Sequence, residues 1–327
     1  MIHLPVHTIP VPPQGQYVED NVLGEWPFIL ETSLLLDLRK AMLQPKTDML
    51  EMTYPMAPIA ITRSCFSTRN GTPRQPLIVP LARARLMFDT TRVPPASLEG
   101  LEEYSHCWII YVFHLNTDLD KLWKDPSRSK LKAKVRVPRL KGEKKGLFAT
   151  RSPHRPCPIG LTVAKVESVQ WNSVLLSGVD LVDGTPILDV KPYLPYCDSI
   201  EGAVVPHWVK MDDLLVVASV NFTDDFFATL TNCWPLIDKK SLYASPEEFQ
   251  RLVKQVLSWD IRSVSQRTQN DETSAKLDTE QVSVDEGRHM IYHLNLEGLD
   301  ITYRITSNSN VVVENVTISP NTNIPPK

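Results

Sequence analysis

A proline-stiffened loop near the middle of the chain carries several side chains that are able to do chemistry. Residues 149–160 read Ala-Thr-Arg-Ser-Pro-His-Arg-Pro-Cys-Pro-Ile-Gly, and three prolines within six residues restrict the backbone. The loop presents two guanidinium groups, an imidazole and a thiol, from Arg151, Arg155, His154 and Cys157. A loop that is rigid before binding loses little conformational entropy when a ligand arrives. We therefore expect a preorganised binding or catalytic site at this loop.

Two other short segments have the composition of functional loops. In residues 73–76 (Pro-Arg-Gln-Pro), two prolines flank an arginine and an amide, which indicates a fixed loop that presents both side chains. Residues 183–186 (Asp-Gly-Thr-Pro) form a good tight turn between apolar runs. Turn chemistry alone would explain the second segment, so a plain hairpin turn and a functional turn are equally open for it.

Two other chemistries are weaker interpretations of these residues. Cys157 and His154 could act as a thiol nucleophile and its base, but Pro156 between them favours an extended pair and no third group is evident. His106 and His114 flank an apolar run and share a face if that run is a regular strand. No cluster of carboxylates or cysteines joins these histidines, so core or edge positions are favoured over metal binding. We therefore expect neither a cysteine hydrolase nor a metal site.

The loop at 149–160 ends a strongly basic stretch of the chain. Residues 130–155 hold ten lysines and arginines and one acidic residue, so this stretch carries +9 although the whole chain carries −3. Such a run is usually a solvated face, but its position beside the polar loop makes a phosphate-backbone footprint credible. The residues that we expect to bind nucleic acid are Lys132, Lys134, Arg136, Arg139, Lys141, Lys144 and Lys145.

Composition excludes the common glycine-rich nucleotide cradles. The 327 residues, enough for about two domains, include only 12 glycines, and neither G-x-G-x-x-G nor a P-loop occurs. A nucleotide-like cofactor would therefore need another architecture. Five cysteines without a C-x-x-C pair indicate a reducing compartment. Since there is neither a secretory signal nor an apolar span at the start or elsewhere, we expect an intracellular, cytoplasmic protein without a membrane segment.

The elements that must position these residues are mostly short strands. Residues 107–115 are a continuous apolar run typical of a buried strand. Further strands are predicted at 59–62, 146–150, 161–169, 174–182 and 187–190, separated by turn residues. Because few helical periods lie between them, a closed or nearly closed β-barrel at 52–215 fits better than a doubly wound sheet.

Different patterns flank this predicted barrel. Residues 1–51 read as an N-terminal extension in which Leu30, Leu34, Leu35, Leu38 and Met42 share one helical face. Residues 216–327 predict a smaller α+β domain. It contains a capping box at 245–248 followed by apolar residues at helical spacing, a polar mobile loop at 263–288, and a meander at 290–294, 299–305 and 311–318.

Taken together, these motifs resemble the TrmO family, also called TsaA-like or YaeB-like. The resemblance rests on the segments 73–76, 100–106 (Gly-Leu-Glu-Glu-Tyr-Ser-His), the strand to His114, 138–140 (Pro-Arg-Leu), 149–160 and 183–196. It is clear over about 55–210 and weaker in the C-terminal domain. The family consists of S-adenosylmethionine-dependent methyltransferases that act on tRNA, so the resemblance implies a TsaA-like β-barrel that binds this methyl donor without a Rossmann motif.

The resemblance also implies a product, an assembly and site residues. The product is N6-methylated threonylcarbamoyladenosine at position 37 beside the anticodon, and the enzymes are homodimers with the cofactor near the interface. The implied donor pocket consists of Pro73, Arg74, Gln75, Pro76, His114, Leu115, Arg151, Leu161, Asp183, Gly184, Thr185 and Pro186. The carbamoylated nitrogen needs a base or strong acceptor, for which Asp183, Asp198 and His154 are candidates. Arg151 and Arg155 would hold the substrate's carboxylate or adjacent phosphates.

The chain departs from the family pattern at two of these places. Cys157 stands where members commonly have asparagine, and Leu115 where bacterial members often have glutamine. Both changes remove an amide group, although backbone contacts from the same positions would persist. A non-catalytic RNA-binding or scaffold protein that retains the barrel is therefore the alternative interpretation.

Overall fold

The computed structural model describes residues 56–116, 132–137, 140, 143–209, 217–259, 291–306, 308 and 310–320. The chain divides into two compact units, 1–55 and 56–327, and all described residues belong to the second unit. The expected N-terminal helix and the expected polar loop at 263–288 lie outside the described residues. The domain boundaries expected after residues 51 and 215 stay predictions.

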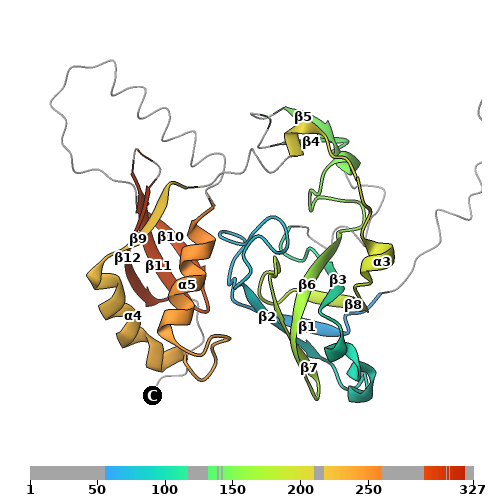
Figure 1. Ribbon diagram of the computed structural model, residues 1–327, viewed down its shortest axis with the longest axis horizontal. Helices are drawn as coiled ribbons and strands as arrows, with labels where there is room; N and C mark the ends of the chain where they lie inside the picture. The colour runs from blue at the N-terminus through green and yellow to red at the C-terminus, as the bar shows by residue number, and fades with distance from the viewer. Residues whose placement is uncertain are drawn as a thin grey trace, which may run out of the picture. The chain divides into compact units, whose positions relative to one another are not determined.

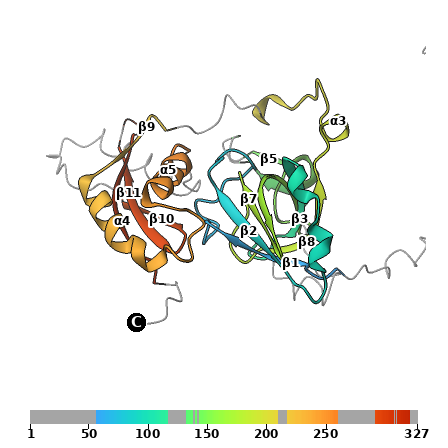
Figure 2. The same ribbon diagram turned by 60° about the horizontal axis from the view of Figure 1, so that its bottom comes forward.

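Six antiparallel strands close into a barrel in the order β1-β2-β7-β6-β3-β8 (Figures 1 and 2). Their bounds are β1 Ala60–Ser64, β2 Arg83–Phe88, β3 His106–Val112, β6 Ile159–Gln170, β7 Ser173–Ser177 and β8 Pro186–Pro192. Burial alternates along β1 and β3, as it must when one face of each strand lines the interior. The predicted mainly-β fold with a barrel is confirmed.

The barrel interior is filled by side chains that leave almost no accessible surface. Leu86, Ile109, Leu176 and Ile187 are fully buried at its centre. Cys107 is buried beside them, and burial raises the pKa of its thiol to about 12, so it is a small apolar core residue. This interior is therefore a packed core, and ligand chemistry must take place on the loops at the barrel ends.

Two of the predicted strands depart most from the structure. β7 ends at Ser177 because Gly178 adopts a φ of +70°, so the strand predicted at 174–182 is too long. The strand predicted at 146–150 is wrong, since β5 (Lys144–Gly146) stops there and a 3-10 helix, η6 (Leu147–Ala149), follows. Thr150 ends that helix by donating its N–H and its hydroxyl to Leu147 O, at 3.1 and 2.8 Å. β5 pairs with β4 (Lys134–Arg136) in a separate two-stranded hairpin.

The C-terminal part is a four-stranded sheet with two helices beside it (Figures 1 and 2). β10 (Ile291–Leu296), β11 (Leu299–Ile305) and β12 (Asn310–Ile318) form the predicted meander, and β9 (Ser219–Phe222) runs parallel to β12. The helix α5 (Pro246–Leu257) begins at the predicted cap, where Ser245 Oγ accepts from Glu248 N. The helix α4 (Asp224–Ile237) was not expected; Thr223 caps it, and its Oγ1 also donates to Glu314 O.

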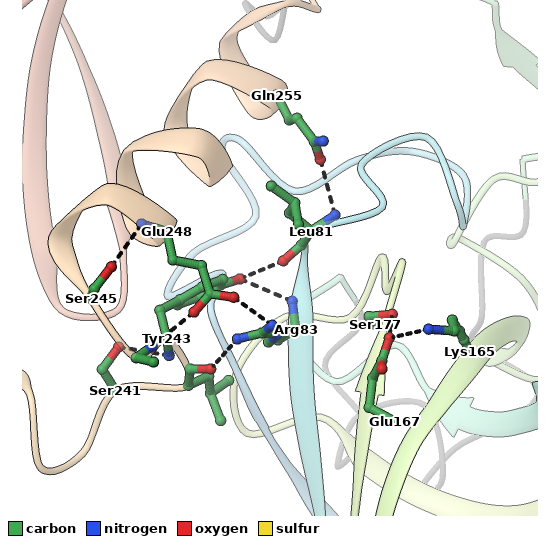
Figure 3. A network of polar contacts seen from close by, with 12 residues as sticks. Leu81, Arg83, Lys165, Glu167, Ser177, Ser241, Tyr243, Ser245, Glu248 and Gln255 are labelled. Carbon is green, nitrogen blue, oxygen red and sulfur yellow. Dashed lines mark hydrogen bonds and ion pairs between the residues drawn. The ribbon is translucent and has the colours of Figure 1, made fainter.

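A polar network joins β2 to the segment that leads into α5 (Figure 3). The Tyr243 hydroxyl donates to Leu81 O at 2.8 Å and accepts from Arg83 N at 3.1 Å. The Arg83 guanidinium lies 2.6 Å from a Glu248 carboxylate oxygen and stacks on the Tyr243 ring at 5.1 Å. Gln255 accepts from Leu81 N at 2.9 Å. Because these partners are partly buried, the network fixes the loop before α5 against the barrel.

The glycine at position 160 makes room for an aromatic ring. Gly160 lies opposite Tyr111 in the β3–β6 register, and a Cβ built at this position would overlap the Tyr111 ring. We expect Gly160→Ala to destabilise the protein by about 2 kcal/mol, because overpacking forces the ring or the strand to move. Urea unfolding measures this loss.

Gly146→Ala is the matched control for this prediction. A Cβ at Gly146 meets no atom within 4 Å, and its φ of −54° suits any residue. Equal unfolding midpoints for the two alanine variants would contradict the packing of Tyr111 on Gly160.

Candidate functional site

The segment 183–186 is pinned to β1 by backbone hydrogen bonds. Asp183 N donates to Phe66 O and Gly184 N donates to Thr62 O, both at 2.8 Å. Thr62 N donates in return to Thr185 O at 2.9 Å. β7 and β8, which this segment connects, are not neighbours in the barrel. The segment is therefore not the tip of a plain hairpin but a turn docked on another strand.

The imidazole of His114 faces this turn. A Cβ at Gly184 would lie 3.9 Å from His114 Nε2, so the glycine leaves its backbone open toward the ring. Burial lowers the pKa of His114 below 6.5, against the opposing effects of the Val112 backbone and the Asp183 charge. The imidazole is therefore mostly neutral at pH 7 and is able to accept a proton. The backbone amide of Ser64 binds Asp183 Oδ1 at 2.8 Å and fixes the carboxylate beside it.

A side-chain contact joins the segment 73–76 to the loop 149–160. Arg151 Nη1 donates to Gln75 Oε1 at 2.6 Å, so the two segments predicted from sequence do meet. Burial raises the pKa of Asp180 above its ordinary value. The Thr162 hydroxyl and the charge of Arg151 act in the opposite direction. A partly buried carboxyl group thus lies close enough to the exposed guanidinium to feel its charge.

Tyr111 belongs to the same group of residues. Burial and the Asp180 charge raise the pKa of its hydroxyl, and Arg151 opposes them. Sequence reasoning missed both Tyr111 and Asp180. Asp180 was identifiable as the single acidic residue in the apolar run 179–182, because a lone charge among buried residues needs partners.

Arg155 and Phe148 form a stacked pair. The Arg155 guanidinium lies 5.3 Å from the centroid of the Phe148 ring and donates to Thr150 O at 3.0 Å. The Phe148 side chain is 75% exposed, which leaves one flat aromatic surface open to solvent. Aromatic rings paired with arginine are suited to stacking on nucleobases. Phe148 was also missed, although a single aromatic residue inside a basic stretch is a usable signal.

Asp198 lies away from the turn at 183–186, and His154 is exposed on the loop 149–160. Asp198 Oδ2 accepts from Leu194 N at 2.9 Å and from Trp108 Nε1 at 2.8 Å, and these bonds lower the pKa of the carboxyl. Trp108 lies near the start of β3, whereas His114 follows its end, so Asp198 and Asp183 are at opposite ends of this strand. His154 is exposed, and its backbone N–H donates to Ser152 Oγ at 3.3 Å.

The first described part of the basic stretch is the β4–β5 hairpin. Arg136 pairs with Lys144 and Lys134 with Gly146, so Lys134, Arg136 and Lys144 share one face, and all three are exposed. Lys145 lies on the other face, 3.9 Å from Glu143. Lys132 is exposed just before β4, while Arg139 and Lys141 lie outside the described residues.

The remaining candidates line the loops and the barrel surface. Leu161 is 58% exposed on β6, and Leu115 is 47% exposed beside His114. Thr185 is buried and its hydroxyl donates to Val182 O at 2.6 Å, which tightens the turn. Among the residues that the structure describes, no three His, Cys, Asp or Glu side chains gather as a metal site would, and no helix is long and apolar enough to cross a membrane.

Comparisons with known proteins agree with the barrel and its loops. The family model of the tRNA-methyltransferase O N-terminal domain matches residues 61–199. A human tRNA (adenine(37)-N6)-methyltransferase is 48% identical over 151 residues, which are 46% of this chain and 32% of that protein. A probable S-adenosyl-L-methionine-binding protein of Pyrococcus abyssi is 38% identical over 148 residues, or 44% of this chain and 71% of that protein. This chain thus spans about a third of the human relative.

The fold is also similar to a solved structure. A crystal structure of TrmO superposes with a TM-score of 0.57 at 28% identity. The match covers 81% of this chain and 100% of that chain, so it extends beyond the barrel into the C-terminal part.

Asp198→Ala tests whether this carboxylate has a structural role at the start of β3. We expect the Trp108 indole N–H resonance to shift upfield, because the ring loses its acceptor. In the wild type this resonance should stay constant as the pH falls and should change only below the ordinary aspartate pKa of 3.8, since the bound carboxylate resists protonation. Asp189→Ala is the control, since that carboxylate pairs with Lys191. An unmoved Trp108 resonance in Asp198→Ala would contradict the assignment.

Proposed function

Since the chain belongs to the tRNA-methyltransferase O family, we propose that it is an S-adenosylmethionine-dependent tRNA methyltransferase. Its substrate is N6-threonylcarbamoyladenosine at position 37, and the methyl group goes to N6. The observation that carries the proposal is the turn at 183–186, pinned to β1 and facing a neutral imidazole, within the stretch that matches the family model.

The residues around this turn fit a small polar cofactor with a nucleoside part. S-adenosylmethionine supplies an electrophilic methyl group on a sulfonium. Gly184 leaves its backbone accessible, since a Cβ at this position would meet only His114 Nε2, at 3.9 Å. Arg151 and Gln75 offer a guanidinium and an amide on the adjoining loops. We assign the donor pocket to Pro73, Arg74, Gln75, Pro76, His114, Leu115, Arg151, Leu161, Asp183, Gly184, Thr185 and Pro186.

We assign proton acceptance to Asp183 together with His114. An amide-like nitrogen is a poor nucleophile until its proton leaves, so the site needs an acceptor within hydrogen-bond reach. Asp183 is held by Ser64 N and lies beside the neutral imidazole. Asp198 is a weaker candidate, because Leu194 N and Trp108 Nε1 already bind its Oδ2 and it lies near the other end of β3. His154 remains available as a contact to substrate.

The anticodon stem-loop would meet the basic hairpin and the Arg155–Phe148 pair. Lys134, Arg136 and Lys144 form one exposed face that suits a phosphate backbone. The open face of Phe148 suits a stacked base, and Arg155 suits the carboxylate of the threonyl group or a phosphate.

The protein would act as a homodimer in the cytoplasm, with the donor site near the subunit interface. Support for an interface comes from large apolar side chains exposed after β8. Tyr196 is 85%, Ile200 76% and Val204 93% exposed, and exposed apolar clusters commonly mark contact surfaces.

Mass analysis of nucleosides tests the proposed reaction. The protein is incubated with S-adenosylmethionine and either unmodified or threonylcarbamoylated tRNA, and one methyl group should appear only on the carbamoylated nucleoside. Arg155→Ala should abolish this transfer while calorimetry gives a donor Kd within about twofold of the wild type, since Arg155 holds substrate. Arg251→Ala, an exposed arginine of α5, is the control. Equal loss of donor affinity in Arg155→Ala would refute this division of roles, and absence of donor binding by the wild type would favour a scaffold.

The salt dependence of tRNA binding tests the basic hairpin. The double variant Lys134→Gln/Lys144→Gln should reduce the slope of log K against log salt by about 1.5 to 2, because two phosphate contacts no longer release counterions. Lys239→Gln/Lys240→Gln, two exposed lysines after α4, is the matched control and should keep the wild-type slope. Identical slopes for both double variants would remove this role from the hairpin.

A further inference from the structure

The turn between β10 and β11 holds a glutamate in an unfavourable backbone conformation. Glu297 has a φ of +53° and Gly298 a φ of +80°, as a two-residue hairpin turn of the primed type requires. Glycine, asparagine and aspartate are the usual residues in such turns, because a longer side chain in the left-handed region is strained against its own backbone. A glutamate kept in this strained conformation points to a role for its side chain or its exact position.

The tip of this hairpin is bonded to the segment that follows β1. Leu296 forms an antiparallel bridge with Phe66, and Glu297 N donates to Cys65 O at 2.9 Å. Gly298 N donates to Ser67 Oγ at 3.3 Å. The hairpin therefore supplies a strand-like partner to residues 65–67.

The other side of this same segment holds the proposed donor turn. Phe66 forms a parallel bridge with Val182, and its carbonyl accepts from Asp183 N. Ser64 Oγ donates to Leu181 O at 2.6 Å, and Ser64 N binds the Asp183 carboxylate. Residues 64–67 thus lie between the β10–β11 hairpin and the turn at 183–186, with hydrogen bonds to both.

The Glu297 side chain anchors the hairpin tip at a fixed point. Its Oε2 accepts from Leu242 N at 3.0 Å. The carbonyl of Leu242 accepts in turn from Arg83 Nη1 at 2.8 Å, within the network that joins β2 to the start of α5 (Figure 3). The donor that Glu297 uses is therefore itself held by the barrel.

We propose that Glu297 is a positioning residue for the methyl-donor pocket, which it serves by holding residues 64–67 where they bind the turn at 183–186. The inference rests on the proposed function for the identity of the ligand. The positioning of the turn by Glu297 does not depend on that identity. A residue of the C-terminal sheet then sets the geometry of a site in the barrel.

The charge of Glu297 gives this proposal a second consequence. Burial raises the pKa of its carboxyl to about 7, and the Asp183 charge adds to the rise. The Leu242 N–H, the Arg63 guanidinium and the Ser241 hydroxyl act in the opposite direction. The group therefore changes from mostly protonated at pH 6 to mostly ionised at pH 8.

Two other titratable groups near Glu297, Cys65 and Tyr243, stay neutral over this range. Burial raises the pKa of Cys65 to about 12 and the pKa of Tyr243 well above 10. Arg63 and Asp183 are then the charged neighbours that act on it. Ionised Glu297 should strengthen binding of a cationic sulfonium at the adjoining turn.

Amide hydrogen exchange on the full chain tests the positioning. In Glu297→Ala the amides of Asp183 and Gly184 should exchange about tenfold faster, while Leu176 in β7 keeps its rate. Glu297→Gln retains an acceptor for Leu242 N and should restore both rates. Asp300→Asn is the matched control, since Asp300 lies on the same hairpin but pairs with His293 at 2.9 Å. Unchanged rates in Glu297→Ala, or equal acceleration at Leu176, would overturn the proposal.

Titration with S-adenosylmethionine at pH 6 and pH 8 tests the charge effect. The ratio of wild-type to Glu297→Gln affinity should be about threefold higher at pH 8 than at pH 6, because only the wild type gains a negative charge. A ratio independent of pH would overturn this part. If the wild type binds no donor, the proposed function fails, whereas the exchange rates still decide the positioning role.

Discussion

The hydrogen bonds between β1 and the turn at 183–186 are the constraint on which the rest of this structure depends. β1 and β8 pair directly at only two positions, Ala60 with Ile187 and Ile61 with Pro186. Proline has no N–H to donate, so β8 begins with a residue that cannot extend the ladder. The bonds from Gly184 to Thr62 O and from Thr62 to Thr185 O continue the closure in its place. The backbone segment that closes the barrel between β1 and β8 therefore also forms the proposed donor site.

This coincidence explains how a glycine-poor chain builds a ligand site without the usual nucleotide cradles. Prolines restrict the loops at 73–76 and 149–160, and two of the few glycines stand beside the proposed site. Gly160 admits the Tyr111 ring, and Gly184 opens the turn toward His114. Rigidity comes from fixed φ angles and from docking on a closed barrel, so little entropy is left to lose on binding.

The sequence predicted features that depend on local chemistry better than those that depend on distant partners. The apolar run of β3 and the capped start of α5 are local signals, and both are present. The helix α4 has apolar residues on several faces and Pro235 inside it, so its periodicity was hidden. The loops that resemble the family were identifiable, but the roles of Asp180 and Glu297 were not. Each depends on neighbours from other elements, which no spacing along the chain reveals.

The charge distribution suits the two proposed ligands, which are opposite in sign. The face of Lys134, Arg136 and Lys144 attracts a polyanion, whereas Asp183, Asp180 and Glu297 surround the turn and its adjoining loops. A cationic sulfonium is favoured by the second environment and disfavoured by the first. The formal net charge of −3 is thus the sum of a basic hairpin and an otherwise acidic chain. The proposed donor and the proposed RNA backbone would therefore rely on different charged groups, and only the target base has to reach the donor turn.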